Sequence, residues 1–168
     1  MKISKVRFLE PGNLPYRPSI KNLYVYDKYI RTPSVGLLTL ATIVKREIDD
    51  TYMYSESISK IKWEDVLDAD IICIGIFTFS ANRGYEVAQY IKDNSNAKVV
   101  LGRLHASMNY TEAVNYCDYV LMGEGDESVD VSICDKGTHP HDCLFPKTES
   151  IYFVSGTSLP FIMSLINS

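Results

Sequence analysis

Residues 70–107, DIICIGIFTFSANRGYEVAQYIKDNSNAKVVLGRLHAS, contain the pattern that decides the fold. An apolar, β-branched run over residues 71–77 ends at a cluster of hydroxyl and amide side chains, and a second apolar run follows over residues 99–101. Apolar runs without alternation are typical of strands covered on both faces, as in a parallel sheet. Two parallel strands require a crossover, and the segment between these runs has a helical period. We therefore expect a strand, a helix and a second strand.

The expected helix has one apolar face. The residues at positions i, i+3, i+4 and i+7 are small or apolar, namely Gly84, Val87, Ala88 and Ile91. Polar residues lie on the opposite side, namely Glu86, Gln89, Lys92 and Asp93. This spacing is typical of an amphipathic helix packed on a sheet. The first set should therefore be buried and the second exposed.

The rest of the first 128 residues alternates between strand and helix patterns in the same way. We expect further strands over residues 2–9, 51–54 and 118–122, and further helices over residues 33–47, 62–67 and 110–116. Residues 10–32 form a long connection, which either packs on the domain surface or forms a wall over a ligand site. Five strands joined through right-handed crossovers predict an α/β fold, a doubly wound, Rossmann-like (flavodoxin-like) parallel sheet in the order 2-1-3-4-5.

Composition narrows the classes of function. The chain has 168 residues, of which 46% are hydrophobic and 23% charged, and its net charge is −4. These are values of a globular protein, and we place one domain at residues 1–128. The negative charge disfavours nucleic acid or an anionic membrane as a partner. Because no apolar run is long enough to cross a bilayer and no signal-like start is present, we expect a cytoplasmic protein with free thiols.

Residues 129–168 differ from the rest, because glycines and prolines interrupt them and no clear period is present. We treat them as an atypical tail of uncertain structure, whose apolar residues suggest a homodimer formed through the tail. Four tail residues are of types that bind zinc, namely Cys134, His139, His141 and Cys143. Their spacing is not that of a usual zinc finger. We therefore expect a loop and no metal site.

Small and polar residues follow two of the expected strands. Thr78-Phe79-Ser80 comes after the first apolar run, and residues 102–105 come after the second. The carboxyl ends of parallel strands meet at one edge, which is where open α/β sheets bind ligands. We therefore expect a ligand site at this edge. No arrangement of serine, cysteine, histidine and aspartate in the chain indicates nucleophilic catalysis, so no catalytic residue is assigned.

Four segments taken together resemble one protein family. They are TPSVGLLTLA (32–41), DADIICIGIFTFSANRGYEVAQYIK (68–92), KVVLGRLHAS (98–107) and DYVLMGEGDES (118–128). In this order they resemble the amino-terminal cobalamin-binding domain of B12-dependent radical SAM enzymes. The resemblance implies cobalamin as the cofactor. It implies that the ligand edge comprises Ser34, Gly36, Thr78, Phe79, Ser80, Gly102, Arg103, Leu104, His105, Gly123, Glu124 and Gly125.

Three departures from the family pattern refine this expectation. The Asp-x-His-x-x-Gly signature of other cobalamin domains is absent, so the resemblance implies cobalamin held without a protein histidine on cobalt. Arg103 stands where the family has the second glycine of VVLGG-x-H, and we expect its side chain to obstruct the corrin. The Cys-x-x-x-Cys-x-x-Cys triad is also absent. The catalytic iron–sulfur domain would therefore be a partner, and this chain alone is not expected to perform radical SAM chemistry.

Two alternatives stay open. The chain could be a flavodoxin-like enzyme that binds a small molecule or nucleotide at the same strand tips. It could also be a folded domain that no longer binds a ligand. Binding of cobalamin would separate the first hypothesis from both.

Overall fold

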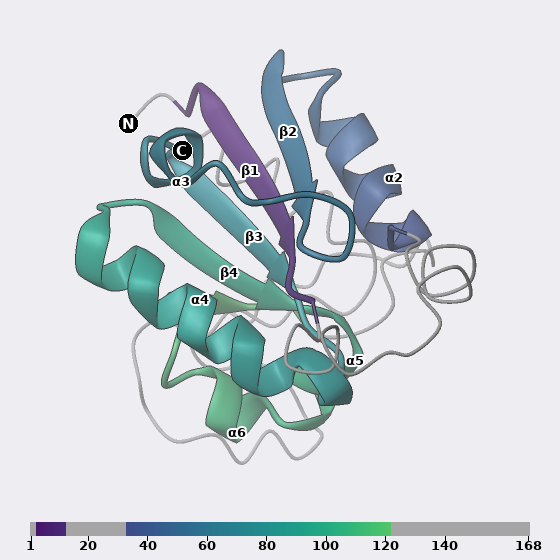
Figure 1. Cartoon of the computed structure of the whole chain (residues 1–168), viewed down its shortest axis with the longest axis vertical. Helices are drawn as coiled ribbons and strands as arrows, with labels where there is room; N and C mark the ends of the chain where they lie inside the picture. The colour runs from purple at the N-terminus through teal and green to yellow at the C-terminus, as the bar shows by residue number, and fades with distance from the viewer. Residues whose placement is uncertain (1–2, 13–32, 122–168) are drawn as a thin grey trace, which may run out of the picture.

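Five parallel strands form one sheet in the order β2-β1-β3-β4-β5 (Figure 1). The computed structural model describes residues 3–12 and 33–121. Its strands are β1 (Lys5–Glu10), β2 (Asp50–Ser55), β3 (Ile71–Gly75), β4 (Lys98–Gly102) and β5 (Tyr119–Val120). Every pair of neighbouring strands is parallel. The doubly wound, Rossmann-like α/β fold and the strand order expected from the sequence are confirmed.

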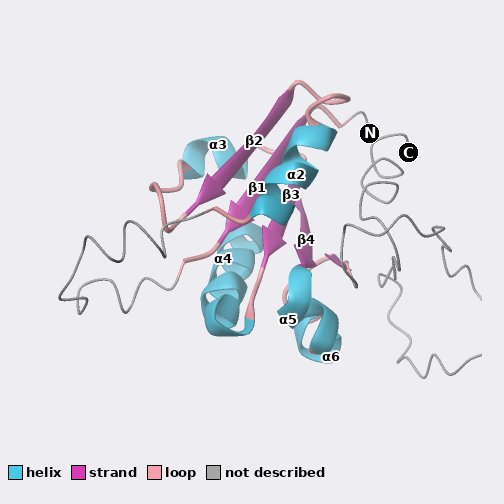
Figure 2. Ribbon diagram, turned by 90° about the vertical axis from the view of Figure 1, so that its right-hand side faces the viewer, coloured by secondary structure: helices cyan, strands magenta, loops and turns pink. Residues whose placement is uncertain are grey.

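Helices lie on both faces of this sheet (Figure 2). They are α2 (Val35–Val44), α3 (Trp63–Leu67), α4 (Ala81–Asn94), α5 (Arg103–Met108) and α6 (Tyr110–Ala113), with a short 3-10 helix, η3 (Thr78–Ser80), before α4. Side chains of α2 share one buried cluster with β1, whereas side chains of α3, α4 and α6 share a second cluster on the other face. None of the helices in this described part of the chain has the length and apolar content needed to cross a membrane.

β3 is the centre of the sheet, since it pairs with β1 on one side and with β4 on the other. All of its residues are buried. Its side chains alternate between the two clusters, with Ile72 and Ile74 on the α4 face and Ile71 and Cys73 on the α2 face. Burying each of these isoleucine side chains contributes about 1.5–3 kcal/mol. The continuous apolar run in the sequence is therefore explained as predicted, because helices cover β3 on both faces of the sheet.

The apolar face of α4 packs on the sheet as expected. Gly84, Val87, Ala88 and Ile91 are all buried. Gly84 is required by its neighbour, because a Cβ at this position would overlap the Cγ2 methyl of Ile76. This close approach sets how near α4 lies to the end of β3.

The structure corrects several expected boundaries. Strand β3 ends at Gly75, whereas the apolar run suggested residue 77, and α2 ends at Val44 rather than near 47. The sequence analysis predicts no helix over residues 103–108, whereas Arg103 begins α5 directly after β4. The glycine before Arg103 resembles a loop residue in sequence, whereas it serves here as the N-cap of the helix.

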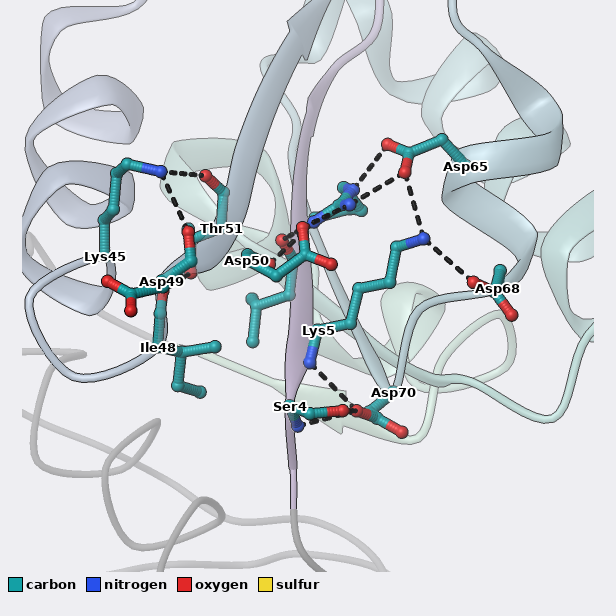
Figure 3. Close-up of polar contacts among 12 residues, drawn as sticks. Ser4, Lys5, Lys45, Ile48, Asp49, Asp50, Thr51, Asp65, Asp68 and Asp70 are labelled. Carbon is teal, nitrogen blue, oxygen red and sulfur yellow. Dashed lines mark hydrogen bonds and ion pairs between the residues drawn. The ribbon is translucent and has the colours of Figure 1, made fainter.

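A network of charged side chains joins β1 to β2 and α3 (Figure 3). Two nitrogens of the buried Arg7 side chain donate to Asp65, at 2.6 and 2.8 Å, and Nη2 also donates to Asp50 Oδ1 at 2.7 Å. Lys5 Nζ lies 3.0 Å from Asp65 Oδ1. The hydrogen bonds from Arg7 hold the pKa of Asp65 well below its usual range. Burial, and then the hydrogen bond to Asp65, raise the pKa of Tyr54 to about 12.

Candidate ligand site

The candidate site lies at the carboxyl ends of β1, β3 and β4, which reach the same edge of the sheet. β3 and β4 end in register, with Gly75 opposite Gly102. The chain leaves β1 toward β2 on one side and leaves β3 toward β4 on the other, so the strand order reverses between β1 and β3. Open α/β sheets bind ligands beside such a reversal, because the connecting segments diverge there.

Arg103 has an unusual backbone at this edge. Its φ is 76°, and it is the one residue other than glycine with positive φ in the part of the chain that the structure describes. Residues other than glycine rarely adopt a positive φ, because this backbone conformation costs them about 1–2 kcal/mol per residue. The glycine that the family pattern has at this position would adopt it freely.

The side chain of Arg103 lies across the end of β3. Its guanidinium carbon is 3.8 Å from the centre of the Phe77 ring. A Cβ added to Gly75 would lie only 2.7 Å from Arg103 Cδ, so the glycine makes room for the arginine. The guanidinium reaches Glu10, at the end of β1, with Nη1 at 3.5 Å from Oε1. Burial lowers the pKa of Arg103, and the Glu10 carboxylate partly offsets this effect.

Glu10 connects β1 to the start of α2. Both carboxylate oxygens lie 3.1 Å from the backbone nitrogen of Ser34, which donates to them. The Ser34 hydroxyl accepts a hydrogen bond from the Leu37 backbone nitrogen at 3.3 Å and so caps the helix. Ser34 is at the predicted edge, but its hydroxyl is engaged in the helix cap. The neighbouring Gly36 faces open space, since a Cβ there would meet nothing within 4 Å.

His105 and Thr78, both predicted for the ligand edge, lie close together. His105, within α5, is buried, whereas Thr78 is exposed. His105 Nδ1 lies 3.4 Å from Thr78 Oγ1 and 3.3 Å from Asn109 Nδ2. Its Nε2 atom has no hydrogen-bond partner among the described residues and lies 3.7 Å from Glu112 Oε2. The ring therefore faces the interior between helices rather than the open edge.

Tyr85, on α4, lies against the same histidine, with ring centres 6.0 Å apart. Its hydroxyl is also buried, and it has no hydrogen-bond partner among the described residues. Burial, with a smaller contribution from the Glu112 carboxylate, raises the pKa of Tyr85 to about 12. The hydroxyl therefore stays protonated at neutral pH.

Three of the predicted edge residues differ in exposure. The Ser80 hydroxyl is buried and accepts from the Phe77 backbone nitrogen at 3.2 Å, so it closes the turn after β3. Phe79 is 68% exposed and its ring stacks on Phe77 at 5.3 Å between centres. Leu104, the second residue of α5, is also exposed. Val35, the first residue of α2, is exposed as well.

The sequence analysis missed two acidic residues at this edge, Glu10 and Glu56. Glu56 follows β2 directly, and its buried carboxylate accepts from Arg83 Nη2 at 2.8 Å and from Arg83 Nε at 3.1 Å. It also accepts from the Gly12 backbone nitrogen at 3.1 Å. Glu10 and Glu56 each lie at the end of a strand, and that position was the available signal for both.

Some predictions fall outside the described residues. These are Gly123, Glu124 and Gly125, the zinc-type residues of the tail, and the homodimer through the tail. Within residues 3–12 and 33–121, no group of three or more histidine, cysteine or acidic residues is arranged to hold a metal ion. Burial raises the pKa of the Cys73 and Cys117 thiols to about 12, which makes both poor nucleophiles.

Comparison with known proteins gives no match to a family model, a curated protein or a solved structure. The fold class therefore rests on the strand order and the parallel pairing described above. The chain is a Rossmann-like α/β protein.

Proposed function

We propose that this chain is a binding module that takes cobalamin at the carboxyl edge of the sheet. The observation that carries the proposal is the backbone at Arg103. Its φ of 76° is a conformation that glycine favours. In the resembled cobalamin domains the corresponding position is glycine. The positive φ at position 103 thus agrees with the glycine of the family pattern, although the residue here is an arginine.

The edge also has the physical properties that a corrin requires. A corrin is a broad, largely apolar disc with amide groups on its rim, so it needs an apolar surface and room for close approach. Phe79, Leu104 and Val35 supply exposed apolar atoms. Gly36 and Gly102 leave space, since an added Cβ would meet nothing closer than 3.5 Å at either position. These residues fit the proposed cofactor.

Arg103 has to move for the corrin to lie over the end of β3. Its guanidinium is held by the Phe77 ring and by one contact of 3.5 Å to Glu10. Both interactions are weak compared with a bidentate ion pair at normal hydrogen-bond length. Rotation of this side chain would therefore open the space at modest cost, and Phe77 and Gly75 would then face the ligand.

We propose that cobalamin is held without a protein histidine on cobalt. His105 is buried, and its Nδ1 atom faces Thr78 and Asn109. Cobalamin, when bound, supplies a cobalt centre whose chemistry serves a radical SAM domain in the family that the sequence resembles. That catalytic domain would be a separate partner in the cytoplasm, and the residues of this chain would bind and orient the cofactor.

A spectral titration tests the proposal. The chain should perturb the visible spectrum of hydroxocobalamin saturably, and Phe79→Ser should weaken binding because it removes exposed apolar area at the edge. Tyr52→Ser, at an exposed aromatic residue within β2, is the matched control and should bind as the parent chain does. If neither hydroxocobalamin nor reduced cobalamin under anaerobic conditions binds, the chain is not a cobalamin module.

A second candidate is a flavodoxin-like binder of a small acidic molecule or nucleotide. The observation that favours it is the arginine itself. A cation at the strand reversal would attract an anionic ligand, whereas a neutral apolar disc has no need of it.

A further inference from the structure

We propose that Arg103 forms a site for an oxyanion, the carboxylate or phosphate group of a small molecule, at the reversal point between β1 and β3. This inference goes beyond cobalamin binding and does not depend on it. It follows from a comparison of the arginines that the structure describes.

Two of these arginines are saturated by carboxylates. Arg7 donates to Asp65 and Asp50 at 2.6 to 2.8 Å. Arg83, whose side chain is 32% exposed, donates to both oxygens of Glu56, at 2.8 and 3.1 Å. These are the normal lengths and the bidentate geometry of arginine–carboxylate pairs.

Arg103 lacks such a partner although it is less exposed than Arg83. Its side chain is 25% exposed, and among the described residues its one acidic contact is Glu10 Oε1 at 3.5 Å. Burial of this guanidinium lowers its pKa, which marks a cation that is poorly compensated. A partly buried charge without a close counterion is unfavourable, and an oxyanion from a ligand would supply the missing acceptors.

The surroundings favour a ligand at this position. The face of the Phe77 ring lies against the guanidinium, and an arginine stacked on a ring keeps its N–H groups available at its edge. The positive φ of Arg103 is a strained conformation, and strained residues of this kind cluster at ligand sites. The side chain extends over Gly75 toward Glu10, at the end of β1.

Glu10 is the residue that a ligand would compete with. Its carboxylate stays bound to the Ser34 backbone nitrogen through two contacts of 3.1 Å. An incoming oxyanion would therefore replace only the long contact to Arg103. The geometry assigns to Glu10 the role of a weak internal substitute for the ligand, and it also predicts that the Glu10 charge opposes binding.

The test is a protein NMR titration with inorganic phosphate and, separately, with acetate, at constant ionic strength. We expect saturable shifts of the Gly75, Phe77 and Arg103 amides with one or both anions, and the anion that binds identifies the source. Arg103→Gln should weaken binding about tenfold or more, as expected for the loss of charged hydrogen bonds. Glu10→Gln should tighten it about two- to fivefold, because a competing charge beside Arg103 is removed.

Arg46→Gln is the matched control, since Arg46 is an exposed arginine just beyond the other end of α2. It should bind as the parent chain does. Arg103→Lys keeps the charge but not the planar fork, so it should bind more weakly than the parent and more tightly than Arg103→Gln. Spectra of every variant report whether it is folded. Binding by folded Arg103→Gln equal to that of the parent, or no binding of either anion to the parent, would overturn the proposal, and neither result bears on cobalamin.

Discussion

Arg7 and Asp65 form a two-point ion pair between β1 and α3, with Nε 2.6 Å from Oδ2 and Nη2 2.8 Å from Oδ1. The Arg7 side chain is only 4% exposed. Asp65 also accepts from the Tyr54 hydroxyl at 2.8 Å. The pair therefore determines how α3 sits against the first two strands, at a distance from the candidate ligand site.

Asp65→Asn should destabilise the fold by about 3 kcal/mol, because it leaves a buried guanidinium with only part of its counter-charge. The matched control is Asp68→Asn. The Asp68 side chain is 79% exposed and pairs only with Lys5 in the described structure, so its loss should cost less than about 1 kcal/mol. Urea unfolding followed by circular dichroism measures both. Equal losses in the two variants would contradict the structural role given to Arg7.

Acid should destabilise the chain through the same carboxylate. Hydrogen bonds from Arg7 lower the pKa of Asp65, and backbone hydrogen bonds from Ser4 and Lys5 lower that of Asp70 despite its burial. A group whose pKa is lower in the folded chain stabilises it fully above the unfolded value of about 4 and loses this effect as the pH falls below it. The melting temperature should therefore drop steeply below about pH 4. The drop should be shallower in Asp65→Asn, and an unchanged slope would remove Asp65 as its cause.

Gly84 and Gly36 should respond in opposite ways to alanine. Gly84→Ala should destabilise the chain by about 1–3 kcal/mol, because the new methyl overlaps Ile76 and overpacks the core. Gly36→Ala should stabilise it by up to about 1 kcal/mol, since alanine favours the helix and the site is open. Thermal unfolding of both variants measures these effects, and each glycine-to-alanine change is the control for the other. A stabilised Gly84→Ala variant would mean that α4 lies farther from β3.

Arg103→Gly should strengthen cobalamin binding. The substitution removes the side chain that lies over Gly75 and Phe77, and it relieves the backbone at a φ of 76°. The gain should be about tenfold if the strain and the displaced contacts together cost about 1–2 kcal/mol. Spectral titration of the variant beside Arg46→Gly provides the measurement. Weaker binding by Arg103→Gly would show that the arginine itself contributes to holding the cofactor.

The sheet was predictable because its signals are local. The apolar run of β3 and the helical spacing of Val87 and Ile91 depend on nearest neighbours in the sequence, and both were interpreted correctly. The ends of elements were less predictable. Gly102 resembles a loop residue, and nothing in the residues after it distinguishes a loop from the first turn of α5.

The sequence predicted where the candidate site lies, but not which hydrogen bonds its side chains make. The expected residues do follow the strand ends, but the sequence gives no sign that His105 is buried or that the Ser34 hydroxyl caps α2. The contact between Arg103 and Glu10 joins residues 93 positions apart, and it depends on where β1 and β4 end relative to β3. Such a contact depends on how the strands are aligned in the folded sheet, which cannot be deduced from the residue types alone.

Two carboxylates hold the points at which residues 13–32 leave and re-enter the described fold. Glu56 accepts from the backbone nitrogen of Gly12, and Glu10 accepts from that of Ser34. Both anchors act on backbone N–H groups, which every residue except proline supplies. Proline at position 12 or 34 would therefore remove the corresponding anchor.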